Sequence, residues 1–183
     1  MVRYVTSNPG KAREAAAILG ETVETVEYEY LEPQSNDLEP VARHGAREAW
    51  EALSGDDPVI VDDAGLFIEV FDGFPGPYSS YVEDTLGIER IAELTLAEAD
   101  HRASFRAVIG YCDGKVVETF SGRVRGRIVA PRGTGGFGYD PIFEHGERTF
   151  AEMSAGEKNA HSHRARALES FAEWFETHTP ARR

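Results

Sequence analysis

The stretch ASFRAVIGYCDGKV, residues 103–116, decides the fold class. Its apolar residues at alternate positions share one face of a strand: Ala103, Phe105, Ala107, Ile109 and Tyr111. Asp113-Gly114 then gives a strong tight-hairpin signal, and a second apolar run begins at Val116. The stretch therefore predicts a long antiparallel pair of strands.

Upstream of this pair, short strands alternate with helices. Residues 2–6 and 23–28 read as strands. Each is followed by a segment with helical spacing of its apolar residues, the second of them over residues 38–53. Strands that interleave with helices and join an antiparallel pair predict an α/β fold, a mixed β-sheet with flanking helices.

Downstream elements complete this pattern. Residues 71–81 are too rich in Gly, Pro and aromatic residues for regular structure and predict a packed loop, with a helix around residues 86–96. Ser154 and Glu157 match a capping box. The helix that closes the chain has an apolar stripe made of Leu168, Phe171 and Phe175. Since ~100 to 200 residues per domain is usual, residues 1–183 are expected to form a single domain.

Composition and charge limit which binding partners and which cellular compartment are expected. A formal net charge of −13 argues against nucleic acid or an anionic membrane, since a phosphate backbone is bound by clustered Lys and Arg. There is no apolar run near the ~18 residues that span a bilayer and no leader pattern, so a cytoplasmic protein is expected. Cys112 is the one cysteine, which rules out an intrachain disulfide and a cysteine-rich zinc site. The scarcity of lysine (Lys11, Lys115 and Lys158) beside many acids is typical of proteins from salt-loving organisms.

The segment Thr6-Ser7-Asn8-Pro9-Gly10-Lys11 lies where the first strand gives way to a helix. Free backbone N–H groups and the helix dipole make such a turn an anion site, with Lys11 as an added positive charge. It is not a Walker A loop, because Val5 and Ala12 stand where that motif needs a Gly and a Ser or Thr. A plain helix start, with Pro9 in the first turn, explains the pattern equally well.

Asp62-Asp63 follows a β-branched run at residues 58–61, which predicts a short buried strand that ends at these acids. Carboxylates there could bind Mg²⁺ together with a phosphate, or deprotonate a water molecule. For an isolated pair, a turn whose acids accept backbone hydrogen bonds is the better explanation. Glu32, taken alone, is one more surface acid.

A glycine-rich segment formally matches the dinucleotide pattern G-x-G-x-x-G at residues 133–138. Tyr139-Asp140-Pro141 cannot open the helix that a dinucleotide site needs, so this interpretation fails. What remains is a flexible loop on which a base could stack, or an ordinary glycine-rich turn.

Residues 157–164 hold two histidines two positions apart, which cannot share one helical face and so disfavour a zinc pair. The segment also offers donors for carbonyl or phosphate oxygens: Lys158, His163 and Arg164. A solvated basic turn ahead of the last helix is equally compatible with the spacing.

The order and spacing of these segments closely resemble the inosine triphosphate pyrophosphatase family, enzymes that remove non-standard purine nucleotides. The resemblance extends from Val2 to the last helix. It rests on TSNPGKAREAAAILG from Thr6, VDDAGL from Val61, GFPGPYSSYV from Gly73, GGFGYDPIF from Gly135 and TFAEMSAGEKNAHSHRARAL from Thr149. The fold so implied is an elongated mixed sheet in two lobes around a central cleft, usually as a homodimer.

By that resemblance, water attacks the α-phosphorus of a purine nucleoside triphosphate (ITP, dITP or XTP), with Mg²⁺ as cofactor, and releases pyrophosphate. Glu32 and Asp63 are implied as metal ligands, with Asp63 also the catalytic proton acceptor and Asp62 supporting the site. The implied contacts to the triphosphate and its surroundings are Thr6, Ser7, Asn8, Pro9, Gly10, Lys11, Asp63 and Ala64. The implied base pocket comprises Phe137, Gly138, Tyr139, Asp140, Lys158, His163 and Arg164.

The chain departs from the family pattern at three positions: Ser7 replaces a common Gly, Ala64 a common Ser or Thr, and Ser80 a common Lys. Two alternatives follow. A Maf-like nucleotide pyrophosphatase shares the general fold and chemistry, but the SHR and FGYDP segments argue against it. A nucleotide-binding sensor without catalysis would explain the three departures, and the retention of Asp63 and Lys11 argues against that.

Overall fold

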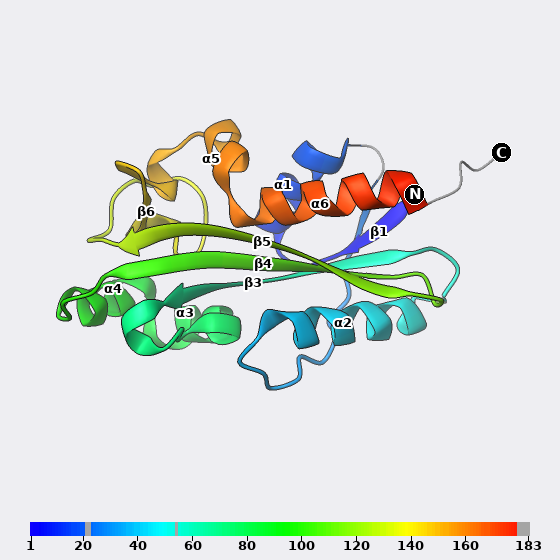
Figure 1. The fold of residues 1–183 in the computed structure, drawn as a ribbon, viewed down its shortest axis with the longest axis horizontal. Helices are drawn as coiled ribbons and strands as arrows, with labels where there is room; N and C mark the ends of the chain where they lie inside the picture. Colours follow the sequence, from blue (N-terminus) through cyan, green and yellow to red (C-terminus); the bar gives the residue numbers. More distant parts are fainter. Residues whose placement is uncertain (21–22, 54, 179–183) are drawn as a thin grey trace.

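In a computed structural model of the chain, residues 1–20, 23–53 and 55–178 are described, and they form one seven-stranded sheet flanked by helices (Figure 1). The strands lie side by side in the order β2-β1-β3-β4-β5-β6-β7. Their bounds are β1 Val2–Val5, β2 Val23–Val26, β3 Val59–Ile68, β4 Arg102–Cys112, β5 Val117–Ile128, β6 Phe143–His145 and β7 Arg148–Thr149. β1 pairs in parallel with β2 and β3, and the remaining pairs are antiparallel. The predicted mixed α/β sheet is confirmed.

Helices cover both sides of the sheet. Their bounds are α1 Pro9–Leu19, α2 Leu38–Ala52, α3 Ser79–Leu86, α4 Ile88–Leu96, α5 Ala155–His161 and α6 His163–His178. In Figure 1, α1, α5 and α6 lie above the long strands, and α2, α3 and α4 lie below them. Within the described residues, no helix is both long and apolar enough to cross a membrane.

The predicted antiparallel pair is confirmed as β4 and β5, in register from Arg102 opposite Arg127 to Cys112 opposite Val117. The connecting loop is longer than a two-residue turn and runs over residues 113–116. Asp113 Oδ1 accepts hydrogen bonds from the backbone N–H groups of Lys115 and Val116, both at 2.9 Å. Gly114 supplies the positive φ of 83° that this loop requires.

One strand prediction was wrong. β3 does not stop at Asp62-Asp63 but continues to Ile68, so the acids lie in the middle of a strand. The cause is tertiary pairing, because Asp62 and Asp63 stand opposite Ile109 and Val108 of β4 and their backbone groups belong to that ladder.

The segment after β3 is more regular than predicted. Short 3-10 turns occupy Glu69–Phe71 and Gly76–Tyr78, and α3 already begins at Ser79, inside the stretch that predicted a loop. The helix predicted around residues 86–96 is α4, and Gly87, with a φ of 84°, separates it from α3. By contrast, the capping box of Ser154 and Glu157 is confirmed at the start of α5.

The core is divided into three clusters along the sheet. One lies between α3, α4 and the far ends of β3 to β5, and includes Phe143 and Phe150. The second joins α1 and α6 to β1, β3 and β4, and contains the predicted Leu168 and Phe171, while Phe175 packs against it partly exposed. The third lies between α2 and the sheet. The space between the first two clusters is where polar side chains gather.

Candidate active site

A pocket of about 460 Å³ opens where β1 ends beside β3. β1 pairs with β3 only as far as Val5 opposite Val61, and the next partner of β3 on this side is Pro75, in an isolated bridge with Phe67. The volume lies in the ~300–1,000 Å³ range usual for small-molecule sites. The lining residues are Val5, Thr6, Ser7, Asn8, Lys11, Tyr28, Glu29, Tyr30, Glu32, Asp62, Ala64, Gly65, Ser79, Ser80, Glu83, Phe105, Phe137, Gly138, Tyr139, Asp140, Lys158, His163 and Arg164.

The predicted triphosphate segment forms the turn from β1 into α1. Asn8 caps the helix, since its Oδ1 accepts from the N–H groups of Gly10 at 2.8 Å and Lys11 at 3.2 Å. Thr6 Oγ1 accepts from the N–H of Asn8 at 3.1 Å. Thr6, Ser7, Asn8 and Lys11 line the pocket, whereas the predicted Pro9 and Gly10, in the first turn of α1, are not among the lining residues. Part of the helix N-terminus is thus already hydrogen-bonded by its own cap.

Gly10 is needed for close packing. A Cβ at this position would lie 2.6 Å and 2.8 Å from ring atoms of Phe137, too close for any larger residue. The glycine therefore lets the ring of Phe137 rest directly on the start of α1.

Asp62 is the most enclosed charge of the site. Its Oδ2 accepts from the hydroxyl of Tyr4 at 3.1 Å and from Nε of Arg164 at 2.6 Å. Lys11 Nζ donates to the backbone carbonyl of Asp62 at 2.5 Å and lies 3.6 Å from its Oδ1. Burial acts to raise the pKa of Asp62, but Arg164 and Lys11 outweigh it and lower the pKa to about 2. Asp62 is a fixed negative charge.

Asp63 has the opposite electrostatic character. Side chains alternate along a strand, so its carboxylate points away from that of Asp62. Among the described residues only Tyr30 donates to it, at 3.3 and 3.4 Å. Burial raises the pKa of Asp63 to about 7, with help from Glu32 and Asp62 and against the effect of Lys11. A carboxyl group with this pKa is suited to accept a proton near neutral pH. Asp63 is not among the residues that line the pocket, although its neighbours Asp62 and Ala64 are.

Glu32 is close enough to Asp63 for its negative charge to raise the pKa of Asp63. Within the described residues, neither carboxylate forms an ion pair with a cationic side chain, in contrast to Asp62. Two carboxylates without cationic partners fit the oxygen-ligand chemistry of a hard divalent cation. No group of three or more metal-ligating side chains occurs among the described residues. The arrangement therefore fits a cation that is held by two carboxylates and completed by substrate oxygens.

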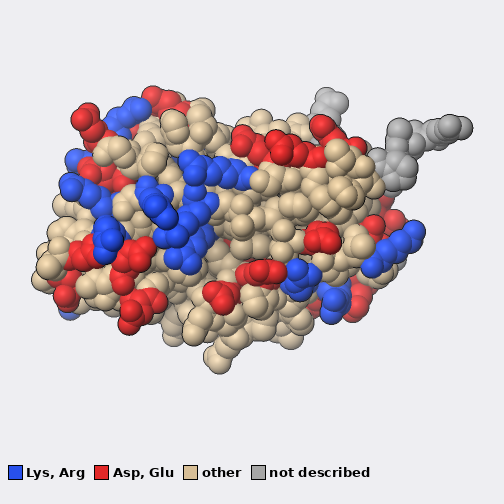
Figure 2. All heavy atoms as spheres, in the orientation of Figure 1, with Lys and Arg blue, Asp and Glu red and all other residues tan. Residues whose placement is uncertain are grey.

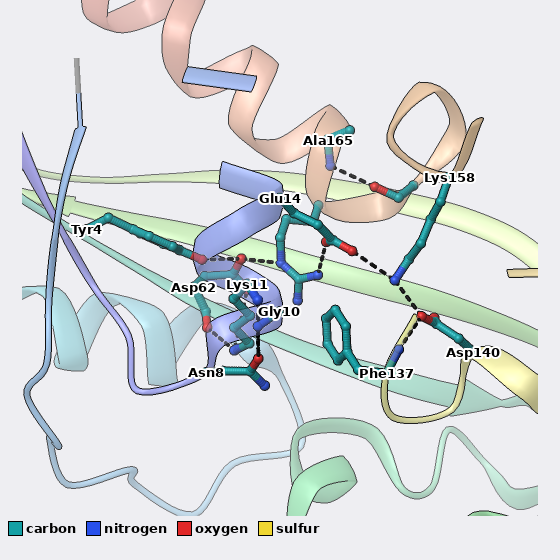
Figure 3. Close-up of polar contacts among 12 residues, drawn as sticks. Tyr4, Asn8, Gly10, Lys11, Glu14, Asp62, Phe137, Asp140, Lys158 and Ala165 are labelled. Carbon is teal, nitrogen blue, oxygen red and sulfur yellow. Dashed lines mark hydrogen bonds and ion pairs between the residues drawn. The ribbon is translucent and has the colours of Figure 1, made fainter. Parts of the chain in front are cut away.

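The predicted basic segment is not a solvated turn. Lys158 and Arg164 are both buried, and a carboxylate that the sequence had not suggested, Glu14 of α1, bridges them. Its Oε1 lies 2.8 Å from Lys158 Nζ and its Oε2 lies 2.6 Å from Arg164 Nη1. Lys158 also pairs with Asp140 at 2.5 Å. With Asp62, these groups form a buried chain of alternating charges across the pocket (Figure 3).

The glycine-rich loop forms one wall. Asp140 Oδ2 accepts from the N–H of Phe137 at 2.9 Å, which closes the loop, and Gly136 and Gly138 adopt positive φ. Lys158 Nζ lies 4.4 Å from the centre of the Phe137 ring. Tyr139 is buried, and its hydroxyl donates to the carbonyl of Ser79. Of the two aromatic residues, Phe137 therefore offers the available ring.

His163 is buried and lines the pocket, with its ring stacked 4.8 Å from that of Phe105. Its Nδ1 has no hydrogen-bond partner in the described part of the chain. Burial and the nearby Arg164 hold the pKa of His163 well below its usual value, so the ring is neutral.

Sequence reasoning missed several members of the site. Glu14 follows Lys11 by three positions on α1, a spacing that places both on one helical face, and this signal was present. Tyr4, Tyr30 and Ser79 carry no such signal, because their roles arise from contacts between distant segments.

Comparison with the sequences of known proteins identifies one family. Residues 2–174 match the Ham1 family. The chain is 50% identical to a protein of Methanopyrus kandleri named dITP/XTP pyrophosphatase, covering 99% of both chains. It is 49% identical to a protein of the same name from Thermococcus kodakarensis, covering 94% of this chain and 95% of the relative.

Solved structures agree with the sequence match. The Staphylococcus aureus Ham1 protein superposes with a TM-score of 0.83 at 28% identity, covering 98% of this chain and all of that one (100%). A Coxiella burnetii HAM1 protein gives a TM-score of 0.79 at 31% identity, covering 97% and 100%. The chain therefore belongs to the Ham1 family.

Proposed function

We propose that this protein hydrolyses deaminated purine nucleoside triphosphates (dITP, XTP and ITP) to the monophosphate and pyrophosphate. The observation that carries the proposal is a nucleotide-sized pocket beside two adjacent carboxylates, of which Asp62 is paired with Lys11 and Arg164 while Asp63 has no ion-pair partner in the described residues. Asp62 therefore orders the cationic side chains, and Asp63 is left to bind a cation or to accept a proton from water. The names of the archaeal relatives support the substrate class.

Mg²⁺ is proposed as the cofactor, held by Glu32 and Asp63. When bound, it would offset negative charge on the phosphoryl oxygens. The two carboxylates suit it because neither is paired with Arg or Lys among the described residues, in contrast to Asp62. Mg²⁺ commonly uses one or two carboxylates and completes its shell with phosphate and water.

For the reaction, Asp63 is proposed to accept a proton from the water that attacks the α-phosphorus. The new bond joins the water oxygen to the α-phosphorus, the bond from that phosphorus to the bridging oxygen breaks, and pyrophosphate leaves. Lys11 faces the pocket from α1 and is placed to offset charge on the phosphates. Asp62 holds Lys11 and Arg164 in place and stays ionised throughout.

The base is proposed to lie against Phe137, with His163, Lys158 and Arg164 around it. Two nitrogens of Arg164 are already bound to Asp62 and Glu14, so this residue contributes mainly positive potential. His163 lines the pocket, and its buried Nδ1 has no hydrogen-bond partner in the described residues. A donor at this place would favour a purine with oxygen at C6, since an amino group there would leave the donor unpaired.

A pyrophosphate-release screen over common and deaminated nucleoside triphosphates with Mg²⁺ tests the proposal. We expect dITP, XTP and ITP to be turned over far faster than ATP or GTP. A preference for pyrimidine or modified bases would favour the Maf-like alternative. Tight binding without turnover would favour a sensor that has lost catalysis.

We propose that residues 1–183 act as one domain in a cytoplasmic homodimer, without a nucleic-acid or membrane partner. Adaptation to high salt is proposed from the charge of −13 and the few lysines. Figure 2 shows one face, on which acidic side chains form several separate groups and Lys and Arg side chains gather in one region.

A further inference from the structure

The segment between β2 and α2, residues 27–37, carries Glu32 but contains no helix or strand. Glu32 is exposed and makes no hydrogen bond or ion pair of its own within the described residues. Its place beside Asp63 is therefore set by its neighbours in the segment.

Glu48, on α2, fixes this segment at two points on either side of Tyr30. Its Oε1 accepts from the hydroxyl of Tyr28 at 3.1 Å. Its two oxygens also accept from the backbone N–H of Leu31, each at 3.3 Å. A single side chain thus holds the residue that immediately precedes Glu32.

Tyr30 forms the third point of attachment. Its hydroxyl reaches both oxygens of Asp63, at 3.3 and 3.4 Å, so the segment that carries Glu32 is joined to the second carboxylate. Its ring rests on Gly45 of α2, where a Cβ would lie 2.7 Å from Cδ2 and 2.8 Å from Cζ. Gly45 and Glu48 are three positions apart and so share one face of α2.

We propose that Glu48, Tyr30 and Gly45 form a clamp that presents Glu32 to the divalent cation at a fixed distance from Asp63. Glu48 and Tyr30 are positioning residues, because they act through Glu32 and Asp63 and not on the substrate. An irregular segment that is ordered before the cation arrives loses less conformational entropy on binding. The inference rests on the proposed function only in taking Glu32 and Asp63 as the ligands.

The test is cation affinity, measured by calorimetric titration with Mg²⁺ in the absence of nucleotide. Glu48→Ala should weaken binding ~10- to 100-fold, the usual effect of losing a group that orients a ligand. Glu51→Ala is the matched control, because Glu51 is an exposed acid on the same helix and should leave affinity unchanged. Circular dichroism checks that both variants fold.

Tyr30→Phe separates the hydroxyl from the ring. It keeps the packing on Gly45 and loses only the link to Asp63, so Mg²⁺ affinity should fall while thermal stability without the cation stays near that of the unaltered protein. Activity should be recovered at saturating Mg²⁺, with a raised apparent KM for the cation. A lower kcat with unchanged cation affinity in Tyr30→Phe and Glu48→Ala would overturn the clamp.

Gly45→Ala provides a double-mutant cycle. The added methyl should displace the ring of Tyr30 and weaken Mg²⁺ binding, but it should have no further effect when Tyr30 is already Ala. Equal losses in both backgrounds would show that Gly45 acts through the helix and would contradict the clamp. An unaltered protein that binds Mg²⁺ but releases no pyrophosphate would contradict the proposed reaction and leave the clamp standing.

Discussion

Arg164 Nε donates to Asp62 Oδ2 at 2.6 Å, with both side chains almost fully buried. This contact joins the first turn of α6 to the middle of β3, across 102 positions of sequence. Glu14 occupies a second nitrogen of the same guanidinium. The candidate site is thus held together by an ion pair that also belongs to the fold.

Replacing Arg164 with Ala should therefore cost stability as well as activity. Removing one partner of a buried pair leaves an uncompensated charge, and we expect a loss of ~3–5 kcal/mol in the free energy of unfolding. Urea denaturation measures this loss. The double variant with Asp62→Asn should recover part of it, because the orphaned charge is removed. An Arg164→Ala protein as stable as the unaltered one would show that Asp62 finds another partner.

Asp63→Asn should still bind nucleotide but turn it over ~10²–10⁴-fold more slowly, the usual contribution of general acid–base catalysis. The change conserves volume and removes both the proton acceptor and one of the two carboxylates proposed to hold Mg²⁺. The measurement is kcat for pyrophosphate release from dITP, beside calorimetric nucleotide binding. Asp56→Asn, at an exposed position, is the control. Turnover within a few-fold of normal would remove Asp63 from the proposed role.

His163→Phe tests base selection. The substitution keeps an aromatic ring against Phe105 and deletes both ring nitrogens. If His163 contacts the C6 oxygen, kcat/KM for ITP should fall more than kcat/KM for ATP. A hydrogen bond worth ~1–3 kcal/mol corresponds to a change of roughly 5- to 150-fold in the ratio. An equal proportional loss on both nucleotides would assign His163 to the fold or the phosphates.

The same variant tests a pH effect on stability. Burial, with Arg164, lowers the pKa of His163 well below 6.5, so the folded state binds fewer protons than the unfolded state. Stability from this group is therefore complete above the unfolded pKa of ~6.5 and is lost as the pH falls below it. We expect the melting temperature of the unaltered protein to drop between pH 7 and pH 5 more than that of His163→Phe. Parallel curves would show that His163 titrates normally.

Local patterns predicted most of the fold. The structure confirms three features that depend on neighbours in the sequence. They are the antiparallel pair predicted from residues 103–116, the capping box at Ser154 and the apolar stripe of α6. β3 was cut short because Asp62 and Asp63 look like turn residues, whereas pairing with β4 keeps them in a strand. A single segment cannot reveal which ladder it will join.

In the candidate site, too, the sequence motifs predicted which residues take part but not the contacts between distant segments. Thr6 to Asn8, Lys11, Asp62 and the residues from Phe137 are brought together as the motifs suggested. The spacing of Glu14 from Lys11 indicates only that both lie on one face of α1. The ion pairs of Lys158 and Arg164 could not be inferred, because Glu14 and Asp140 reach them from other elements. The roles of Tyr30 and Glu48 depend in the same way on how one irregular segment packs against α2.

The last prediction concerns salt and follows from the charge of −13. Like charges repel in the compact state, and at ~0.01 M salt the screening length is ~30 Å, so repulsion extends over most of the surface. At ~1 M the screening length is ~3 Å and only adjacent charges interact. Stability and activity should therefore rise steeply between these concentrations, while the buried pair of Asp62 and Arg164 is screened far less.

Thermal unfolding in KCl, from low to multimolar concentration, measures the effect, with sucrose as an uncharged control. Screening alone should saturate within a few tenths molar, because by then the screening length is already shorter than most distances between surface charges. A further rise above that concentration would indicate that the acidic surface binds ions or holds hydration. A melting temperature that does not change with KCl would contradict adaptation to salt and leave an acidic enzyme suited to ordinary ionic strength.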